Sequence, residues 1–219
     1  MQTEPVPVLP VEYIQFGCGL CAPPTWRNFD AGPAFWLEKN LPFLREALVR
    51  KGFPDYPANI DYGDVVAGLP VAERSARGVY CSHVLEHLAL NEFRAALLNV
   101  FRYLRPGGTF RLVVPDLEYI AKSYVAAGGP DAAIRFMQEA HLGEPHKSRG
   151  LSDKARSLFG RSQHLTMWDF KGMAEELRQA GFVNIRRAAC KDGTDPRFLD
   201  VEDPGRWENC LGVECNRPA

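Results

Sequence analysis

Short apolar stretches, most of them closed by glycine, proline or aspartate, set the pattern of this chain. Residues 12–17 alternate between apolar and polar, carry β-forming side chains and lead into a Gly-x-Gly turn, which predicts a first strand. Residues 110–114 are apolar except for Arg111 and end at Pro115-Asp116, as expected for a strand covered on both faces. Further strands are expected at 26–30, 59–62, 78–82, 183–185 and 211–215.

Apolar positions spaced by three and four predict the helices between these strands. The clearest helix begins with Asn91 as its N-cap, reaches Leu104 and is ended by Pro106-Gly107-Gly108. Asp169 opens another helix, for which Gly181 is the stop. Helices are also expected at 34–51, divided by Pro42, and at 117–127 and 130–141. This alternation is typical of βαβ units in an α/β protein with a mostly parallel sheet.

Length and composition fit one domain over residues 1–219, with 119–163 as an insertion that covers the sheet. Apolar residues make up 46% and charged residues 24%, so a core can form without disulfides. The 26 basic and 27 acidic residues give a net charge of -1, which argues against nucleic acid or an anionic membrane as the partner. Without a long apolar run or a secretory start, a cytoplasmic monomer or homodimer is the expectation.

The six cysteines do not indicate a disulfide scaffold or a zinc finger. Cys18 and Cys21 form a C-x-x-C pair, but Pro23 and Pro24 follow where a redox motif would open a helix. The other pair, Cys210 and Cys215, lies on a predicted strand, where the odd spacing points the two side chains to opposite faces.

The turn Gly17-Cys18-Gly19 after the first strand is the best candidate for a ligand site. It fits a dinucleotide loop formally, but the prolines at 23 and 24 remove the N–H groups and the helix start that would hold a pyrophosphate. S-adenosylmethionine has no phosphate and fits better, with Asp30 available for its ribose. Two plainer interpretations stay open: the glycines form only a turn, and Asp30 only caps the next helix.

The link between the first two strands is unusually short, because eight residues separate Gly17 from Trp26. Either the crossover has lost its helix or Asp30 lies in a loop. Both alternatives leave its carboxylate near the glycine turn.

Two longer segments carry a family resemblance. Val79-Tyr80-Cys81-Ser82-His83-Val84-Leu85-Glu86-His87-Leu88, followed by Leu104-Arg105-Pro106-Gly107-Gly108, resembles the class I S-adenosylmethionine-dependent methyltransferases, particularly small bacterial members found beside polysaccharide genes. The Gly-Cys-Gly loop, the segment Trp26-Arg27-Asn28-Phe29-Asp30 and the segment Val114-Pro115-Asp116-Leu117-Glu118 are similar as well.

The resemblance implies a Rossmann-like, seven-stranded, mostly parallel sheet with the last strand antiparallel, helices on both faces and a helical insertion after the fifth strand. It also implies a donor site in which Gly17, Cys18 and Gly19 lie under S-adenosylmethionine and Asp30 binds its ribose. By the same resemblance Asp64 would lie near the adenine, and Ser82 and His83 near the methionine end. Cys21 departs from the family pattern, in which a third glycine is usual.

Metal chemistry is a rival interpretation of part of this region. His83-x-x-Glu86-His87 matches the zinc-peptidase pattern H-x-x-E-H, but that pattern needs a helix, and His83 directly follows a predicted strand. We therefore expect no catalytic zinc. A looser divalent ion at Glu86 and His87 stays open, as does a purely structural role for both residues.

On the acceptor side, His164 is the preferred general base, with Asp116 and His83 as the other catalytic candidates. Each has a plainer alternative: His164 anchors the insertion, and Asp116 caps a helix. The acceptor is expected to be a small molecule or glycan, methylated on oxygen or nitrogen. A non-catalytic module that binds S-adenosylmethionine is the alternative. The insertion contains four basic residues, Arg149, Lys154, Arg156 and Arg161. They suit an acidic acceptor, or they simply form a solvated face.

Overall fold

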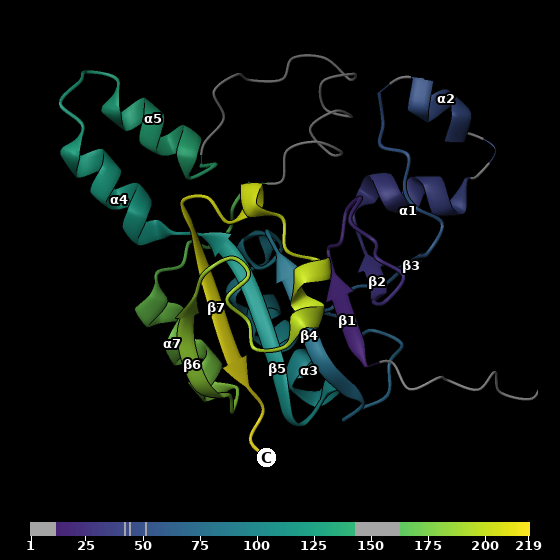
Figure 1. Cartoon of the computed structure of the whole chain (residues 1–219). Coiled ribbons are helices and arrows are strands. Elements are labelled where there is room, and N and C mark those ends of the chain that lie inside the picture. The colour runs from purple at the N-terminus through teal and green to yellow at the C-terminus, as the bar shows by residue number, and fades with distance from the viewer. Residues whose placement is uncertain (1–11, 42, 44, 51, 143–162) are drawn as a thin grey trace, which may run out of the picture.

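A computed structural model describes residues 12–219 except 42, 44, 51 and 143–162. Within these residues seven strands form one sheet in the order β3-β2-β1-β4-β5-β7-β6 (Figure 1). Strands β1 to β5 run parallel to one another, whereas β7 runs antiparallel to both β5 and β6. The predicted fold class is confirmed. The strands are β1 (Tyr13–Phe16), β2 (Arg27–Asp30), β3 (Ile60–Tyr62), β4 (Ala76–Ser82), β5 (Leu104–Pro115), β6 (Val183–Ala188) and β7 (Cys210–Asn216).

The predicted helices are present with shifted ends. They are α1 (Pro33–Asn40), α2 (Arg45–Arg50), α3 (Leu90–Tyr103), α4 (Leu117–Ala126), α5 (Ala132–Glu139) and α7 (Phe170–Gln179). The prediction that Asn91 caps α3 is wrong, because Ala89 is the N-cap and its N–H donates to the Glu92 carboxylate. Asp169 does cap α7, accepting a hydrogen bond from the Gly172 N–H. Pro42, predicted to divide α1 from α2, lies outside the described residues.

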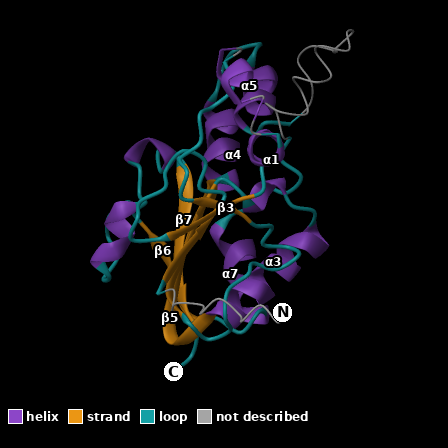
Figure 2. Cartoon of the chain, turned by 90° about the vertical axis from the view of Figure 1, so that its right-hand side faces the viewer, coloured by secondary structure: helices purple, strands orange, loops and turns teal. Residues whose placement is uncertain are grey.

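One face of the sheet is covered by α3 and α7 (Figure 2). Phe93 and Leu97 of α3, with Met173 and Leu177 of α7, pack against the alternate strand residues that point to this side. Phe93 also stacks on Trp168 just before α7, with ring centroids 4.3 Å apart. This face holds the main apolar core.

The other face is covered by the segment 189–209, which contains two 3-10 helices, η3 (Pro196–Asp200) and η4 (Pro204–Arg206), and no α-helix. Its Phe198 and Trp207 pack with Tyr80 and Val113 of the sheet and with Trp26. We call residues 189–209 the covering segment. Because it precedes β7, it is attached to the sheet at both of its ends.

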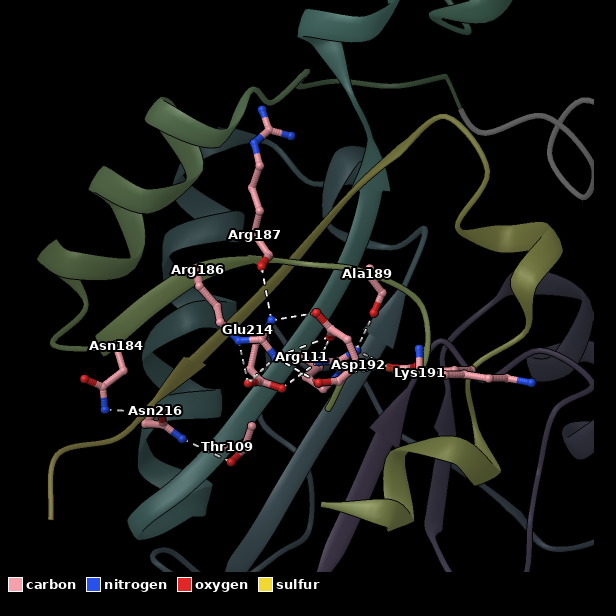
Figure 3. Close-up of polar contacts among 11 residues, drawn as sticks. Thr109, Arg111, Asn184, Arg186, Arg187, Ala189, Lys191, Asp192, Glu214 and Asn216 are labelled. Atoms are coloured by element: carbon pink, nitrogen blue, oxygen red, sulfur yellow. Dashed lines mark hydrogen bonds and ion pairs between the residues drawn. The ribbon is translucent and has the colours of Figure 1, made fainter. Parts of the chain in front are cut away.

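A buried arginine holds the covering segment in place (Figure 3). Arg111 of β5 is 0% exposed and bonds to Glu202 and Asp192 of the segment and to Glu214 of β7, with N–O distances of 2.6–3.0 Å. Arg186 of β6 adds contacts of 2.7–2.8 Å to Asp192 and Glu214. The guanidinium of Arg111 therefore satisfies three carboxylates on the face that the covering segment packs against.

The predicted insertion begins with α4 and α5, which form a pair that projects beyond the carboxyl end of β5 (Figure 1). Tyr124 of α4 and Phe136 of α5 join the two helices, with ring centroids 5.4 Å apart. The four basic residues predicted to line the acceptor side lie at 149–161, outside the described residues. No helix in the described part of the chain is long and apolar enough to cross a membrane.

Candidate functional site

Strands β1 to β5 are parallel, so the loops that follow them gather at one edge of the sheet (Figure 1). All the residues predicted for the donor site lie on these loops or at the strand ends. The geometry of each loop shows what its residues do.

The glycine turn after β1 needs glycine at two positions for different reasons. Gly17 has φ +62° and lies against Val84, whose Cγ2 would be 2.1 Å from a Cβ on Gly17. Gly19 has φ +55°, and a Cβ there would meet no atom within 4 Å among the described residues. Gly17 is therefore a packing position, whereas Gly19 borders open space where a ligand can approach the backbone.

Asp30 closes this turn from the end of β2. Its side chain is 8% exposed, Oδ2 accepts the Gly19 N–H at 2.9 Å, and Oδ1 accepts the Gly32 N–H at 2.7 Å. The carboxylate is thus held beside the open space at Gly19, and each oxygen retains a lone pair for a further donor. A buried carboxylate that keeps free lone pairs beside this open space can accept hydrogen bonds from hydroxyl groups such as those of a ribose.

The connection from β1 to β2 has no helix, although the two strands pair in parallel with Ile14 opposite Arg27. Two buried amides hold it instead. Gln15 Nε2 donates to the Cys21 carbonyl at 2.6 Å and to Asn28 Oδ1 at 2.5 Å, and Asn28 Nδ2 donates to the Pro23 carbonyl at 3.1 Å. The sequence alternative of a crossover stripped of its helix is therefore correct.

The sequence analysis missed Gln15 and Asn28 as residues that shape the site. Their signal was available, because both are polar residues inside short strands that are otherwise buried, where an amide needs a partner.

The two cysteines of this loop differ in environment. Cys18 packs against Phe35 and Ile60, and burial together with Asp30 raises the pKa of its thiol to about 12. Its N–H donates to the Phe29 carbonyl at 3.2 Å, so Cys18 shapes the turn. Cys21, where the family usually has glycine, is exposed and does not fill the turn.

Asp64, predicted near the adenine, follows β3 and caps the next turn. Its Oδ1 accepts the Val66 N–H at 2.8 Å. The Gly63 N–H donates to the Asp30 carbonyl at 3.1 Å, which ties this loop to the one that carries Asp30.

Ser82 ends β4 and His83 follows it, and both are held by Arg206 of the covering segment. Arg206 donates to Ser82 Oγ at 3.0 Å and to the Ser82 carbonyl at 2.6 Å, while the Arg206 carbonyl lies 2.9 Å from His83 Nε2. His83 has φ +56°. Sequence reasoning missed Arg206, since nothing in a polar connection between strands indicates which residue returns to the sheet.

His83 is a charged histidine in this arrangement. Burial alone would lower its pKa, but contacts with Cys210, Glu86 and the Arg206 carbonyl raise the pKa to about 10. Its Nδ1 lies 3.3 Å from Glu86 Oε1.

Glu86 lies at the centre of a histidine cluster. Its side chain is 1% exposed, and the ligand atoms of Glu86, His87 and His164 all lie within 4.8 Å of one another. Glu86 and His87 belong to a single 3-10 turn, η2 (Leu85–His87), and His83 lies outside it, so the helical arrangement of a zinc peptidase is not present. Burial and the neighbours His87 and His141 lower the pKa of His164, against an opposing effect of Glu86.

Asp116 is engaged on both sides. Its Oδ1 accepts the Glu118 N–H at 2.9 Å as the N-cap of α4, and its Oδ2 lies 3.1 Å from Arg187. These contacts match the plainer interpretation of Asp116 as a cap. Its proposed catalytic role stays a prediction.

Comparison with known proteins agrees with this geometry. Residues 27–187 match the family Methyltransf_23, described as "Methyltransferase domain". No curated protein matches the chain. A solved S-adenosylmethionine-dependent methyltransferase from Thermotoga maritima is 12% identical with a TM-score of 0.51, over 94% of this chain and 82% of that one.

Two further solved structures are similar at lower TM-scores. One is a complex between the Trm112 methyltransferase activator and a methyltransferase from Haloferax volcanii, at 16% identity and TM-score 0.47, over 95% of this chain and 83% of that one. The other is phosphoethanolamine N-methyltransferase 2 from Haemonchus contortus in complex with S-adenosyl-L-methionine, at 12% identity and TM-score 0.46. The similarity covers 95% of this chain and 49% of that one.

The sheet and its flanking helices define a Rossmann-like α/β protein. The family match covers most of the chain, and the chain belongs to the methyltransferase-domain family. The expectation of a class I S-adenosylmethionine-dependent methyltransferase is confirmed at this level.

Proposed function

We propose that the protein transfers the methyl group of S-adenosylmethionine to an oxygen or nitrogen of a small-molecule or glycan acceptor. The observation that carries the proposal is the pairing of the open backbone at Gly19 with the buried carboxylate of Asp30. When bound, the donor supplies an electrophilic methyl group whose carbon–sulfur bond electrons return to sulfur as the acceptor atom bonds to carbon.

The residues of this chain have the tasks of holding the two reactants in line and managing the acceptor proton. Gly19 and Asp30 bind the nucleoside end, and the end of β4 with Ser82 and His83 faces the methionine end. The acceptor side is assigned to the cluster around His164, as the sequence predicted for the general base. The segment after β5 determines which acceptor the protein methylates, because loops beyond the strand ends carry specificity in such folds.

Calorimetry with S-adenosylmethionine and S-adenosylhomocysteine tests the donor site. We expect both to bind to the purified protein, and we expect Asp30→Asn to weaken binding by roughly 10- to 100-fold, because one charged hydrogen-bond acceptor is lost. Asp61→Asn is the matched control, since Asp61 lies on the neighbouring strand and pairs with Arg27 at 3.5 Å. No binding of either nucleoside by folded protein would refute the proposal.

A donor-binding module without turnover is the second candidate. It is favoured by the engagement of Asp116 with α4 and Arg187, which removes one predicted catalytic carboxylate from the acceptor side. Methyl transfer from labelled donor across acids, sugars and amines distinguishes the two. Turnover of any acceptor refutes the module.

A further inference from the structure

We propose that Glu86, His87 and His164 bind a divalent transition-metal ion beside the carboxyl end of β4. The three ligand atoms lie within 4.8 Å of one another. Metal–ligand bonds of about 2.1 Å in a tetrahedral site place ligand atoms about 3.4 Å apart, so each side chain would move by about 1 Å or less.

The first argument is a buried carboxylate that faces an unpartnered imidazole nitrogen. Glu86 Oε1 lies 3.3 Å from His83 Nδ1, whereas Glu86 Oε2 and the Nδ1 of His164 have no hydrogen-bond partner among the described residues. The side chains of both residues are buried. Unsatisfied buried groups of this kind are rare and costly, and a cation between them would satisfy both at once.

The second argument is the orientation of His87. Its Nδ1 lies 3.2 Å from the Gln163 carbonyl, and because a carbonyl oxygen can only accept a hydrogen bond, Nδ1–H is the donor in this contact. The other ring nitrogen, Nε2, lies on the side of Glu86, 4.0 Å from its Oε1. A histidine that donates one ring N–H to a backbone carbonyl and presents the other nitrogen is the usual arrangement of a metal ligand.

The third argument is that the two halves of the cluster are already joined. The N–H groups of Leu165 and Thr166 donate to the Glu86 carbonyl at 2.8 and 3.1 Å. The chain that carries His164 is therefore fixed to the turn that carries Glu86 and His87, so little ordering is needed on metal binding.

Two imidazoles and one carboxylate suit zinc, iron, cobalt or nickel better than magnesium or calcium. Three protein ligands leave at least one coordination position open. As a consequence that rests on the proposed function, an acceptor hydroxyl in that position would lose its proton more readily. His164 would then act through the metal.

Two other arrangements compete with the proposal. In the first, Glu86 pairs only with the His83 imidazolium 3.3 Å away. In the second, a metal is held by His83 and His87 in the peptidase manner. Both make His83 essential, whereas the proposed site does not include it.

The experiment uses full-length protein purified without a histidine tag. Metal content is measured by mass spectrometry, and the chelated protein is titrated with Zn²⁺ and with Co²⁺, whose visible d–d bands report its ligands. We expect about one ion per chain. Glu86→Gln and His164→Asn should each weaken metal binding by at least roughly 10- to 100-fold. That is the effect of losing a hydrogen bond that only supports a ligand, and these variants lose the ligand itself.

His141→Asn and His83→Asn are the matched controls. Both histidines have positive φ, which asparagine tolerates, and His141 packs on the His164 ring at 4.8 Å without belonging to the ligand set. Both controls should retain the ion. Circular dichroism checks that each variant folds. If a ligand variant does not fold, the histidine ring-proton NMR signals that bound Co²⁺ shifts in the wild-type protein identify the ligands.

Absence of a bound ion from the wild-type protein, or its loss in His83→Asn, would overturn the inference. Donor binding is measured separately in the presence of chelator. Donor binding without metal binding refutes only the metal site, whereas metal binding without donor binding refutes only the proposed function.

Discussion

At the scale of single residues, the two glycines of the turn after β1 have separable roles. Gly17→Ala would place a methyl group on Val84 in a backbone conformation that favours glycine, so we expect a loss of about 2–4 kcal/mol of stability. Gly19→Ala should cost only about 1 kcal/mol and should mainly weaken donor binding, because its methyl group enters the open space. Urea unfolding and calorimetry on both variants check this. Equal stability losses would contradict it.

Residues of this kind were predictable where the chemistry is local. Gly17, Gly19 and Asp30 follow from a strand, a turn and a strand end, and Gly19 and Asp30 are joined by a hydrogen bond. Arg206 was not predictable, because its partner Ser82 lies 124 residues away. The histidine cluster was half predicted: Glu86 and His87 are adjacent in sequence, whereas His164 reaches them only through the fold.

At the scale of elements, the covering segment depends on one buried arginine. Replacing Arg111 by methionine keeps its length but leaves Glu202 buried without its cation and Glu214 with Arg186 alone. Removal of one partner from a buried ion pair costs about 3–5 kcal/mol, and we expect a loss of that size. Arg178→Met is the control, since its pair with Glu175 is exposed and should contribute about 1 kcal/mol or less. Chemical denaturation of both variants gives the comparison.

Asp192 makes the attachment of the same segment sensitive to acid. Burial would raise its pKa, but Arg186 and Arg111 hold the pKa of this carboxyl well below its usual range. A pKa lower in the folded state stabilises the fold above the unfolded value near ~4 and loses that effect as pH falls through the folded value. Asp192→Asn should therefore lower the melting temperature at pH 7, with a difference that shrinks on acidification. A constant difference from pH 7 to pH 3 would contradict this.

The local sequence pattern predicted the strands and helices, but it did not predict the covering segment that packs on the sheet. The strands and α3 follow from alternation and from spacings of three and four, since those patterns reflect which side each residue buries. The start of α3 was misplaced because Glu92, and not Asn91, provides the capping contact. The covering segment carries no regular period, and its attachment depends on ion pairs to Arg111 of β5 that no local window contains.

At the scale of the whole molecule, ligand binding should be visible as stability. A ligand at 100 times its dissociation constant adds about 2.7 kcal/mol, which raises the melting temperature of a domain this size by roughly 5–10 °C. We expect this shift with S-adenosylhomocysteine and none with NAD⁺, because Pro23 and Pro24 lack the N–H groups that a pyrophosphate needs. Thermal scans with both ligands test it, and stabilisation by NAD⁺ would count against the assigned site.

The helix-free connection between β1 and β2 also bears on how the chain folds. Gln15 and Asn28 bond across only 13 residues, whereas Arg111 bonds to Glu202 and Glu214 across 91 and 103. Closing a short loop costs less entropy, so the parallel pair that carries the glycine turn can assemble before the covering segment docks. Asn28→Ala should slow refolding, whereas Arg111→Met should chiefly accelerate unfolding.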